Sequence, residues 1–351
     1  SMTAMTGAQA EPSDSVRVAV IGYGWWGRTI TALLADSAQL QVVAVLETSA
    51  AIREQMTGDA QRLGFRVNAD FDALLADPQI EAVILCTPHE FHAEQIIAAA
   101  RAGKHVFCEK PLCLTAAQAK HAIDTCREHG RVLGIGHERR FEPAVQALRS
   151  RIAAGDLGTV LQIEGNFSQD KFFALPPDNW RLSNRHAPVG PLTATGIHLV
   201  DLSIAVLGPC ESVWARLATR GSYFENGDTL AIMMAFSGGA NAMISAVLAT
   251  PFEGRFAVYG SQGWVEIRDR THPENPTGWD VTTALRGQPR STEFSPPAPS
   301  VRINLEAFAA AIRGKAPYPV PAREMLANVA SLEAIMRSAK SGEIEPVHVP
   351  A

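Results

Sequence analysis

The strongest constraint on the fold of this chain is the stretch from Val16 to Gly27, which reads VRVAVIGYGWWG. Its first half is rich in β-branched residues, as in a strand buried on both faces. The apolar spacing then lengthens to that of a helix, so the glycines stand in a strand–turn–helix unit. Gly22 allows the tight turn, Gly24 leaves room for a pyrophosphate, and Gly27 permits close helix–strand packing. The pattern predicts a dinucleotide-binding turn with phosphates at the helix N-terminus.

A second strand supports this interpretation. The run Leu40–Leu46 is followed at once by Glu47, which stands 20 residues after Gly27. A carboxylate at this position takes the adenosine ribose hydroxyls in dinucleotide-binding units. Because a carboxylate repels a 2′-phosphate, Glu47 favours NAD over NADP, although Thr48 and Arg53 leave some room for the use of both. The alternative is a turn whose glycines serve only the backbone conformation.

The composition of the chain indicates which classes of protein it can belong to. A length of 351 residues suggests about two domains, and 46% hydrophobic residues can fill real cores. The net charge of −5 leaves no electrostatic footprint for nucleic acid. No apolar run approaches the roughly 18 residues of a membrane span. Residues 1–14 are small and polar, do not resemble a secretion signal, and are expected to form a disordered tail.

The cysteines and histidines suggest neither disulfides nor a metal. The five cysteines are odd in number and contain no C-x-x-C pair, which fits buried thiols in a reducing cytoplasm. The ten histidines contain no H-E-x-x-H motif. His89 and His92 are three residues apart, but no third or fourth ligand candidate is close in the sequence. We therefore expect a cytoplasmic protein without a metal site.

The order of predicted elements divides the chain into two domains. Strands and helices alternate over residues 15–137, which predicts a doubly wound parallel sheet of the Rossmann type. Residues 138–351 begin with a predicted helix at Glu142–Ala154 and continue with many strand-like runs, which a helical segment at Ile197–Leu207 interrupts. Two helices, at Val301–Arg313 and Ala322–Lys340, close the chain. This texture predicts an α+β domain with a large, mostly antiparallel open sheet that binds the substrate and forms oligomer contacts.

With these features in hand, the chain resembles the Gfo/Idh/MocA oxidoreductase family, which includes glucose–fructose oxidoreductase and inositol dehydrogenase. The resemblance covers nearly the full length. The segments that carry it are Gly22-Tyr-Gly-Trp-Trp-Gly27, Thr87-Pro88, Glu109-Lys110-Pro111, Arg140-Phe141-Glu-Pro143, Trp180-Arg181, Gly196-Ile-His198-Leu-Val-Asp201 and the closing helix around Ala334–Ser338. It implies a small carbohydrate or polyol substrate, a nicotinamide cofactor and a homodimer or homotetramer.

The resemblance also implies roles for individual residues on the cofactor side. Thr87 and Pro88 would line the nicotinamide ribose, and Glu109 would hold the cofactor side. His89 stands where relatives often carry asparagine, so a cofactor contact there is left open. Trp25 and Trp26 either form an apolar wall over the cofactor or only pack the loop. The expected cofactor-binding set is Gly22, Tyr23, Gly24, Trp25, Trp26, Gly27, Glu47, Thr87, Pro88, His89, His92, Glu109 and Lys110.

Two residues are the expected catalytic pair. The resemblance implies that Lys110 lies beside the nicotinamide and hydrogen-bonds the substrate hydroxyl that becomes a carbonyl, and a cation there would stabilise a developing alkoxide. The alternative is a solvated surface lysine. His198 is the candidate general acid and base, because an imidazole exchanges protons near neutral pH. The alternative for His198 is a capping or core histidine. Asp201 either orients His198 or only pairs with solvent.

One position departs from the family pattern. Polyol-oxidising relatives often carry an aspartate four residues before the histidine, where this chain has Ala194. A mechanism of lysine, aspartate and histidine cannot be carried over whole, so we expect Lys110 and His198 to suffice. The expected substrate-binding residues, which read the polarity of the substrate, are Lys110, Arg140, Asn166, Arg181, Thr195, Asp201 and His198.

Three functions remain compatible with the sequence. The leading one is an NAD-dependent dehydrogenase that acts on a secondary alcohol of a sugar, sugar acid or cyclitol. A second keeps NAD bound and uses transient oxidation to drive glycoside elimination, which requires another base such as Tyr223, Glu225 or His186. A third is a non-catalytic NAD-binding regulatory protein, in which Ala194 records lost chemistry.

Overall fold

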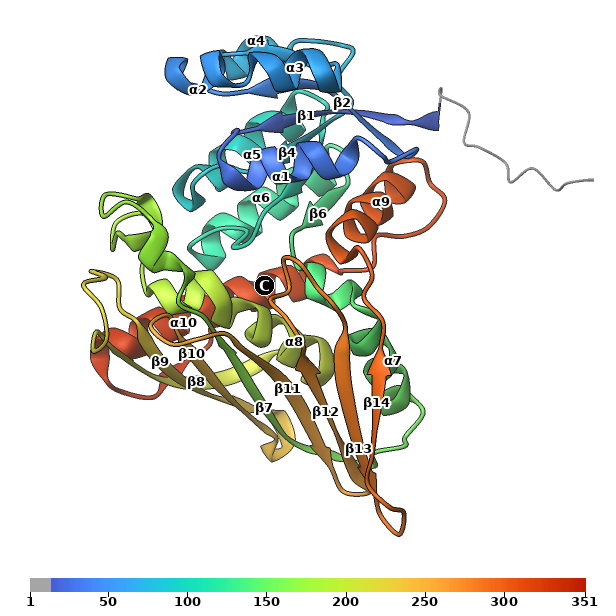
Figure 1. Cartoon of the computed structure of the whole chain (residues 1–351), viewed down its shortest axis with the longest axis vertical. Helices are drawn as coiled ribbons and strands as arrows, with labels where there is room; N and C mark the ends of the chain where they lie inside the picture. The colour runs from blue at the N-terminus through green and yellow to red at the C-terminus, as the bar shows by residue number, and fades with distance from the viewer. Residues whose placement is uncertain (1–13) are drawn as a thin grey trace, which may run out of the picture.

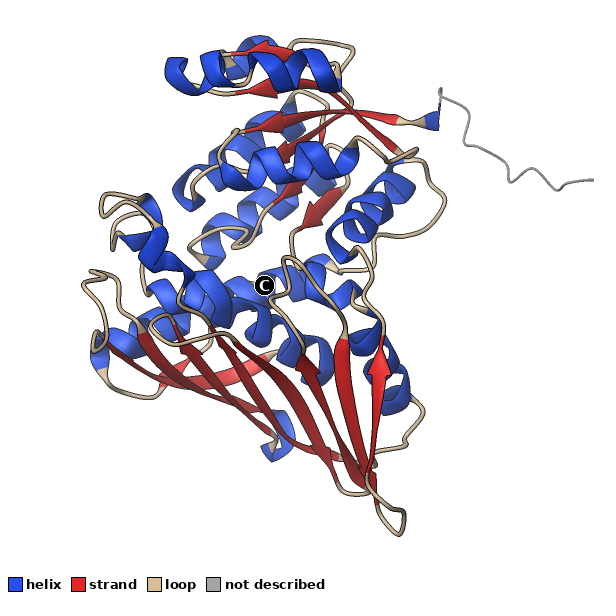
Figure 2. Ribbon diagram, in the orientation of Figure 1, coloured by secondary structure: helices blue, strands red, loops and turns tan. Residues whose placement is uncertain are grey.

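The computed structural model describes residues 14–351, so the expected tail falls outside the described part of the chain except for Asp14. Within that part, the chain forms two sheets, one above the other in Figure 1, with helices packed around and between them. Figure 2 shows the long strands of the second sheet side by side along the lower edge of the molecule. The α/β fold class expected from the sequence is confirmed, with a parallel first sheet and a mostly antiparallel second one.

The first sheet has the strand order β3-β2-β1-β4-β5-β6, and its paired strands are parallel. This is the order of a dinucleotide-binding fold, in which the order reverses between β1 and β4 and leaves a crevice at their carboxyl ends. The elements are β1 (Val16–Ile21), α1 (Trp25–Leu34), β2 (Leu40–Leu46), α2 (Ala50–Gln55), α3 (Thr57–Leu63), β3 (Arg66–Asn68), α4 (Phe71–Leu75), β4 (Ala82–Leu85), α5 (His92–Arg101), β5 (His105–Cys108), α6 (Ala116–Glu128) and β6 (Leu133–Ile135).

The local signals in this half account for the helix starts. The Asp70 carboxylate accepts backbone N–H groups at the start of α4, and the Thr115 hydroxyl accepts the N–H of Gln118 at the start of α6. Both are N-caps that satisfy donors without an intrahelical partner. Residues 50–63 form two short helices, α2 and α3, which meet at Met56. The buried Met56 side chain belongs to the core under β1 and β2, which fixes the bend.

The second sheet has the order β14-β13-β12-β11-β7-β10-β9-β8-β15, and only β7 and β10 pair in parallel among the described strands. Its elements are α7 (Pro143–Ala153), β7 (Val160–Ser168), α8 (Ile197–Leu207), β8 (Cys210–Ala218), β9 (Thr229–Phe236), β10 (Asn241–Val247), β11 (Glu253–Gly260), β12 (Gly263–Asp269), β13 (Trp279–Leu285), β14 (Ser291–Ser295), α9 (Ser300–Ile312), α10 (Ala322–Ser341) and β15 (Glu345–Pro346).

The two closing helices join the halves. Phe308 of α9 packs against Phe107 of β5 with ring centroids 5.6 Å apart, so α9 covers the first sheet although it follows the second in sequence. Helix α10 contacts both α6 and β8 and runs between the two sheets in Figure 1. The second core lies between one face of the nine-stranded sheet and helices α7, α8 and α10. In the described residues, no helix is both long and apolar enough to cross a membrane.

Candidate active site

The glycine turn has the geometry that a pyrophosphate site requires. Gly22 has a φ of +94°, a backbone conformation that side chains resist, and a Cβ on Gly27 would lie 1.9 Å from the carbonyl oxygen of Gly22. A Cβ on Gly24 meets nothing within 4 Å, so the space above this residue is open. Helix α1 starts at the next residue without a side-chain cap. The turn therefore leaves uncapped helix donors facing open space, and a dinucleotide fits there.

Glu47 lies at this turn. Its carboxylate accepts the backbone N–H of Tyr23 at 3.0 Å and that of Ser49 at 2.9 Å. The Arg53 guanidinium donates to the carbonyl oxygens of Glu47 and Thr48, so it holds the backbone beside the carboxylate. The Tyr23 side chain is turned the other way, into the core, where its hydroxyl donates to Asp59. The structure thus brings Glu47 to the turn and gives Tyr23 only a backbone contribution.

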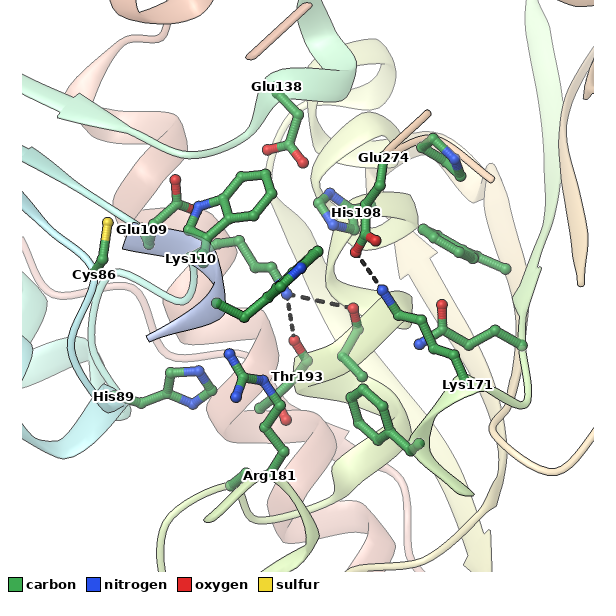
Figure 3. A pocket seen from close by; sticks show the side chains of 18 of the residues that line it. Cys86, His89, Glu109, Lys110, Glu138, Lys171, Arg181, Thr193, His198 and Glu274 are labelled. Atoms are coloured by element: carbon green, nitrogen blue, oxygen red, sulfur yellow. Dashed lines mark hydrogen bonds and ion pairs between the residues drawn. The ribbon is translucent and has the colours of Figure 1, made fainter. Parts of the chain in front are cut away.

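A cavity of about 410 Å³ lies between the carboxyl edge of the first sheet and the second domain. This volume falls in the range of small-molecule sites. Trp25 and Trp26 form one end of it, and Lys110 and His198 both line it. These two side chains are 88 positions apart in the sequence, one after β5 and one in α8, and Figure 3 shows them facing the same space. Trp25 and Trp26, which belong to the glycine turn, line the same cavity as Lys110 and His198 and so connect the pair to the turn.

The Lys110 ammonium is anchored by backbone carbonyls. Its Nζ donates to the carbonyl oxygens of Thr193 at 2.7 Å and Ala194 at 3.3 Å, as the dashed lines in Figure 3 show. Both acceptors lie in a π-helical turn, Leu192–Gly196, that precedes α8. Burial lowers the pKa of Lys110, while the nearby Glu138 and Glu109 carboxyls act in the opposite direction. The third ammonium donor direction is left for a ligand.

His198 is a buried imidazole. Its Nδ1 has no hydrogen-bond partner within residues 14–351, and its ring packs against Phe167 with centroids 5.9 Å apart. Burial holds the pKa of His198 well below its ordinary value, and the positive charges of Lys110 and Arg139 lower it further. The imidazole is therefore neutral at pH 7 and able to accept a proton.

Two carboxyl groups complete this wall of the cavity. Burial raises the pKa of Glu109 to about 7. Burial and the neighbouring Glu109 carboxylate raise the pKa of Glu138 to about 8. Glu138 begins the 3-10 turn Glu138–Phe141 after β6, and Figure 3 shows it on the same side of the cavity as His198. The sequence analysis missed Glu138, because a glutamate in a charged Glu-Arg-Arg run reads as an ordinary surface turn.

The opposite wall comes from the connection between β7 and α8, which the sequence analysis also missed apart from Arg181. The Arg181 guanidinium lies 4.4 Å from the centroid of the Trp180 ring, and both residues line the cavity. Lys171 lies over the Trp25 ring at 4.9 Å and pairs with Glu274. These contacts place the connection over the cavity mouth. The other lining residues of this connection are Gln169, Phe172, Leu175 and Ala187.

The loop after β4 contributes one histidine to the cavity and one to the framework. Thr87 and His89 line the cavity, and the His89 ring meets Trp180 edge-on at 4.9 Å. Pro88 lies between them and begins a short 3-10 turn. His92 is fully buried, and its two ring nitrogens contact the carbonyl oxygens of Pro111 at 2.7 Å and Thr87 at 2.9 Å. The His92 side chain therefore connects the loop after β4 with the loop after β5 and lies away from the cavity.

Arg140 and Asp201 lie elsewhere than expected. The Arg140 guanidinium makes a bidentate pair with the Asp201 carboxylate at 2.7 and 2.8 Å and a further bond to Glu324. Burial works against the charged form of Asp201, yet His137 and Arg140 outweigh it and lower the pKa of Asp201. The three charges join the turn after β6 to α8 and α10. The expected substrate contacts of Arg140 and Asp201 are replaced by a buried ion-pair network.

Two further expected substrate residues also lie outside the cavity. Asn166 accepts the Ser168 hydroxyl at 2.7 Å, and strand alternation points it away from the buried face that carries Phe167. Thr195 is fully buried and donates its hydroxyl to Pro191. Thr193 and Ala194 occupy the cavity wall in its place.

None of the three alternative bases is among the cavity-lining residues of the described chain. Tyr223 is exposed, Glu225 accepts the backbone N–H of Asn184, and His186 pairs with Glu90 at 2.8 Å. The last contact ties the connection between β7 and α8 to the first domain.

Comparison with known proteins follows the same division of the chain. Residues 16–137 match the oxidoreductase family with an NAD-binding Rossmann fold, and residues 145–266 match the GFO/IDH/MocA C-terminal domain. The chain is 30% identical to 1,5-anhydro-D-fructose reductase of Ensifer adhaerens, over 86% of this chain and 90% of that one. It is 29% identical to D-xylose 1-dehydrogenase (NADP(+)) 2 of Haloferax volcanii, over 78% and 82%.

A solved structure shows the same arrangement. The aldose-aldose oxidoreductase of Caulobacter crescentus, solved with glycerol, superposes with a TM-score of 0.84 at 26% identity and covers 95% of this chain and 99% of that one. Sequence and fold thus agree over both domains. The chain belongs to the Gfo/Idh/MocA oxidoreductase family.

Proposed function

We propose that this protein is an NAD-dependent dehydrogenase acting on a secondary alcohol of a sugar, sugar acid or cyclitol. The observation that carries the proposal is the joint placement of Lys110 and His198 in one cavity beside the glycine turn. The names of the two relatives, a 1,5-anhydro-D-fructose reductase and a D-xylose 1-dehydrogenase, support a carbohydrate substrate.

The residues at the turn suit a dinucleotide. Gly24 would admit the pyrophosphate, the N-terminus of α1 would bind it, and Glu47 would take the adenosine ribose hydroxyls. Thr87, His89, Glu109 and Trp26 would surround the nicotinamide end. When bound, the cofactor supplies the hydride acceptor, while the protein supplies position and field. Glu47 supports NAD, but the xylose dehydrogenase of Haloferax volcanii is named for NADP, so the two cofactors must be compared directly.

The roles of the catalytic pair follow from their surroundings. Lys110, held by two carbonyls, would donate its remaining hydrogen to the substrate oxygen and stabilise negative charge that develops there. His198, neutral and without a partner on Nδ1 within residues 14–351, would accept the hydroxyl proton. Arg181 and His89 would contact the remaining hydroxyls of the substrate from the opposite wall.

The test is an assay of the purified protein with NAD or NADP against a panel of sugars, sugar acids and cyclitols, followed through the absorbance of the reduced nicotinamide. We expect sustained turnover with NAD on at least one polyol. Tight NAD binding without turnover on any member would contradict the proposal and favour the regulatory alternative. Glycoside cleavage without net nicotinamide reduction would favour the elimination alternative.

A further inference from the structure

Glu138 stands in a second cavity as well as in the first. The second cavity measures about 670 Å³, shares Trp25 and Trp26 with the first, and is bounded by α1, the start of α9 and the β12–β13 connection. Glu138 and Arg139 line both cavities. A titratable side chain that lines both the candidate active site and the second cavity is placed to carry a proton from one to the other.

Within residues 14–351, the Glu138 carboxyl accepts its own backbone N–H and no hydrogen bond from another side chain. The neighbouring Arg139 guanidinium is already paired with Glu142 and, through two bonds of 2.8 Å, with Asp269. The Lys110 ammonium is occupied by two carbonyl oxygens. Figure 3 draws no hydrogen bond or ion pair from Glu138 to the other side chains shown. A carboxyl group whose hydrogen-bond partner is its own backbone N–H can change its protonation state without breaking an ion pair.

The chemistry of the cavity requires such a group. In the proposed reaction a neutral histidine takes the substrate proton, and the resulting imidazolium lies near the positive charges of Lys110 and Arg139. The aspartate that relatives often carry is replaced by Ala194, whose side chain takes no proton. Without a proton acceptor behind it, a buried imidazolium among cations is costly.

We propose that Glu138 is the proton relay of this enzyme, taking the substrate proton from His198 and passing it to the second cavity. This inference rests on the proposed dehydrogenase function. In the oxidation, the O–H bond breaks and its electron pair forms the second carbon–oxygen bond, while the carbon-bound hydrogen leaves with its electron pair as hydride to the cofactor. The proton moves to the imidazole and then to the Glu138 carboxylate, which becomes a neutral acid and discharges to solvent. In the reverse reaction the same acid supplies the proton.

The titration of Glu138 is set by the groups that face it from every neighbouring element. The groups that act on it are Glu109 and Lys110 after β5 and Arg139 and Glu142 in its own segment. His198 on α8 lines the first cavity with Glu138, Glu274 in the β12–β13 connection lines both cavities, and Arg302 at the start of α9 lines the second. Burial and Glu109 together raise the pKa of Glu138 to about 8. The relay is therefore charged for oxidation only as the pH rises through about 8, whereas reduction uses the neutral acid that predominates below it.

The test compares Glu138→Gln, Glu138→Asp and a matched surface control, Glu128→Gln, for oxidation of the substrate over pH 6–9. For wild type and control we expect kcat/KM to rise through about pH 8. In Glu138→Gln, kcat/KM should fall about 100-fold and its rise near pH 8 should disappear. Glu138→Asp should recover part of the rate and part of the pH dependence. Wild-type activity and pH dependence in Glu138→Gln would overturn the relay while leaving the dehydrogenase function intact.

A second readout does not depend on turnover. Infrared difference spectra of the cofactor-free protein between low and high pH should contain the carbonyl band of a protonated carboxylic acid that disappears near pH 8. The component of this band that disappears near pH 8 should be absent in Glu138→Gln and retained in Glu128→Gln, whereas the buried Glu109 and Glu142 carboxyls, with pKa values raised to about 7, contribute to the band in both variants. In Glu109→Gln its midpoint should fall, because the neighbouring negative charge is removed. A spectrum unchanged by Glu138→Gln would overturn the assignment even if no substrate had been found.

Discussion

At the residue scale, the central feature is a lysine whose partners are backbone carbonyls. The sequence placed Lys110 after a parallel strand, and the structure adds that its Nζ is directed by the carbonyls of Thr193 and Ala194. Backbone acceptors orient the ammonium without neutralising it, so its charge remains for a substrate oxygen. The sequence could not predict this, because a π-helical turn has no distinct residue pattern.

Replacement of Lys110 by methionine tests this role. Methionine keeps much of the length and apolar stem but removes the charge, so we expect kcat to fall at least about 100-fold with NAD binding retained. The measurement pairs initial rates with calorimetric titration of NAD. A rate near that of wild type would remove Lys110 from the mechanism.

Glu47 carries the prediction on cofactor choice. Because its carboxylate lies at the glycine turn, Glu47→Ser should lower the ratio of kcat/KM for NAD over NADP by about 10-fold or more. Thermal unfolding of the variant serves as the control, since the Tyr23 N–H loses its acceptor. An unchanged ratio in a folded variant would place the ribose elsewhere.

The sequence indicated which residues have the chemistry of a site, but it did not indicate which groups those residues contact. Lys110 and His198 were chosen on motif and chemistry, and the structure brings them to one cavity. Arg140 and Asp201 were chosen on the same grounds, but each satisfies the other in a buried pair. A charged residue next to a motif reads the same in sequence whether its partner is substrate or protein. Only the packing of α8 against the turn after β6 separates the two cases.

At the element scale, regular segments followed from their patterns. Strand β2 and helix α8 have the bounds expected from the sequence. The short edge strands β14 and β15 and the connection between β7 and α8 were not predicted, because they lack a sustained apolar period. That connection supplies one wall of the cavity, so this wall is the part of the candidate site that was hardest to predict.

The glycine turn allows binding and folding to be separated. A Cβ on Gly24 meets open space, so Gly24→Ala should change the free energy of unfolding little but weaken NAD binding by about 10-fold or more. A Cβ on Gly27 meets the Gly22 carbonyl oxygen, so Gly27→Ala should destabilise the fold by about 1–3 kcal/mol.

Gly58→Ala is the matched control for both substitutions, since its Cβ also meets nothing within 4 Å and Gly58 belongs to α3, outside the glycine turn. Denaturant unfolding and NAD titration of the three variants provide the measurements. Equal NAD affinity in Gly24→Ala and wild type would mean that no pyrophosphate lies against this backbone.

At the scale of the whole molecule, the site depends on how the two halves are joined. The Arg140–Asp201–Glu324 network ties the turn after β6 to α8 and α10, and α9 returns from the second domain to cover the first sheet. The open face of the second sheet exposes Leu161, Trp214, Met233 and Met243. A homodimer or homotetramer through that face stays a prediction.

The substitution Asp201→Asn tests whether this ion-pair network holds the two halves together. Removing one charge leaves the buried Arg140 guanidinium short of its partner, which costs about 3–5 kcal/mol in unfolding free energy. The pKa of Asp201 is lowered in the folded state, so its stabilisation is present above the ordinary carboxyl pKa and is lost as the pH falls through the folded value. Denaturant unfolding from pH 7 to pH 3 should show a weaker acid dependence in the variant than in wild type.

Asp124→Asn, which breaks an exposed pair with Lys120, is the matched control and should leave the stability nearly unchanged. If Asp201→Asn were as stable as this control, the ion-pair network would not be what holds the two halves together.

The most direct test of the account is a crystal structure of the protein with NADH and a polyol that it oxidises. The account predicts the dinucleotide along the glycine turn, with one substrate oxygen within hydrogen-bond distance of both Lys110 Nζ and the His198 imidazole. A substrate bound with its reacting oxygen away from these two side chains would contradict it.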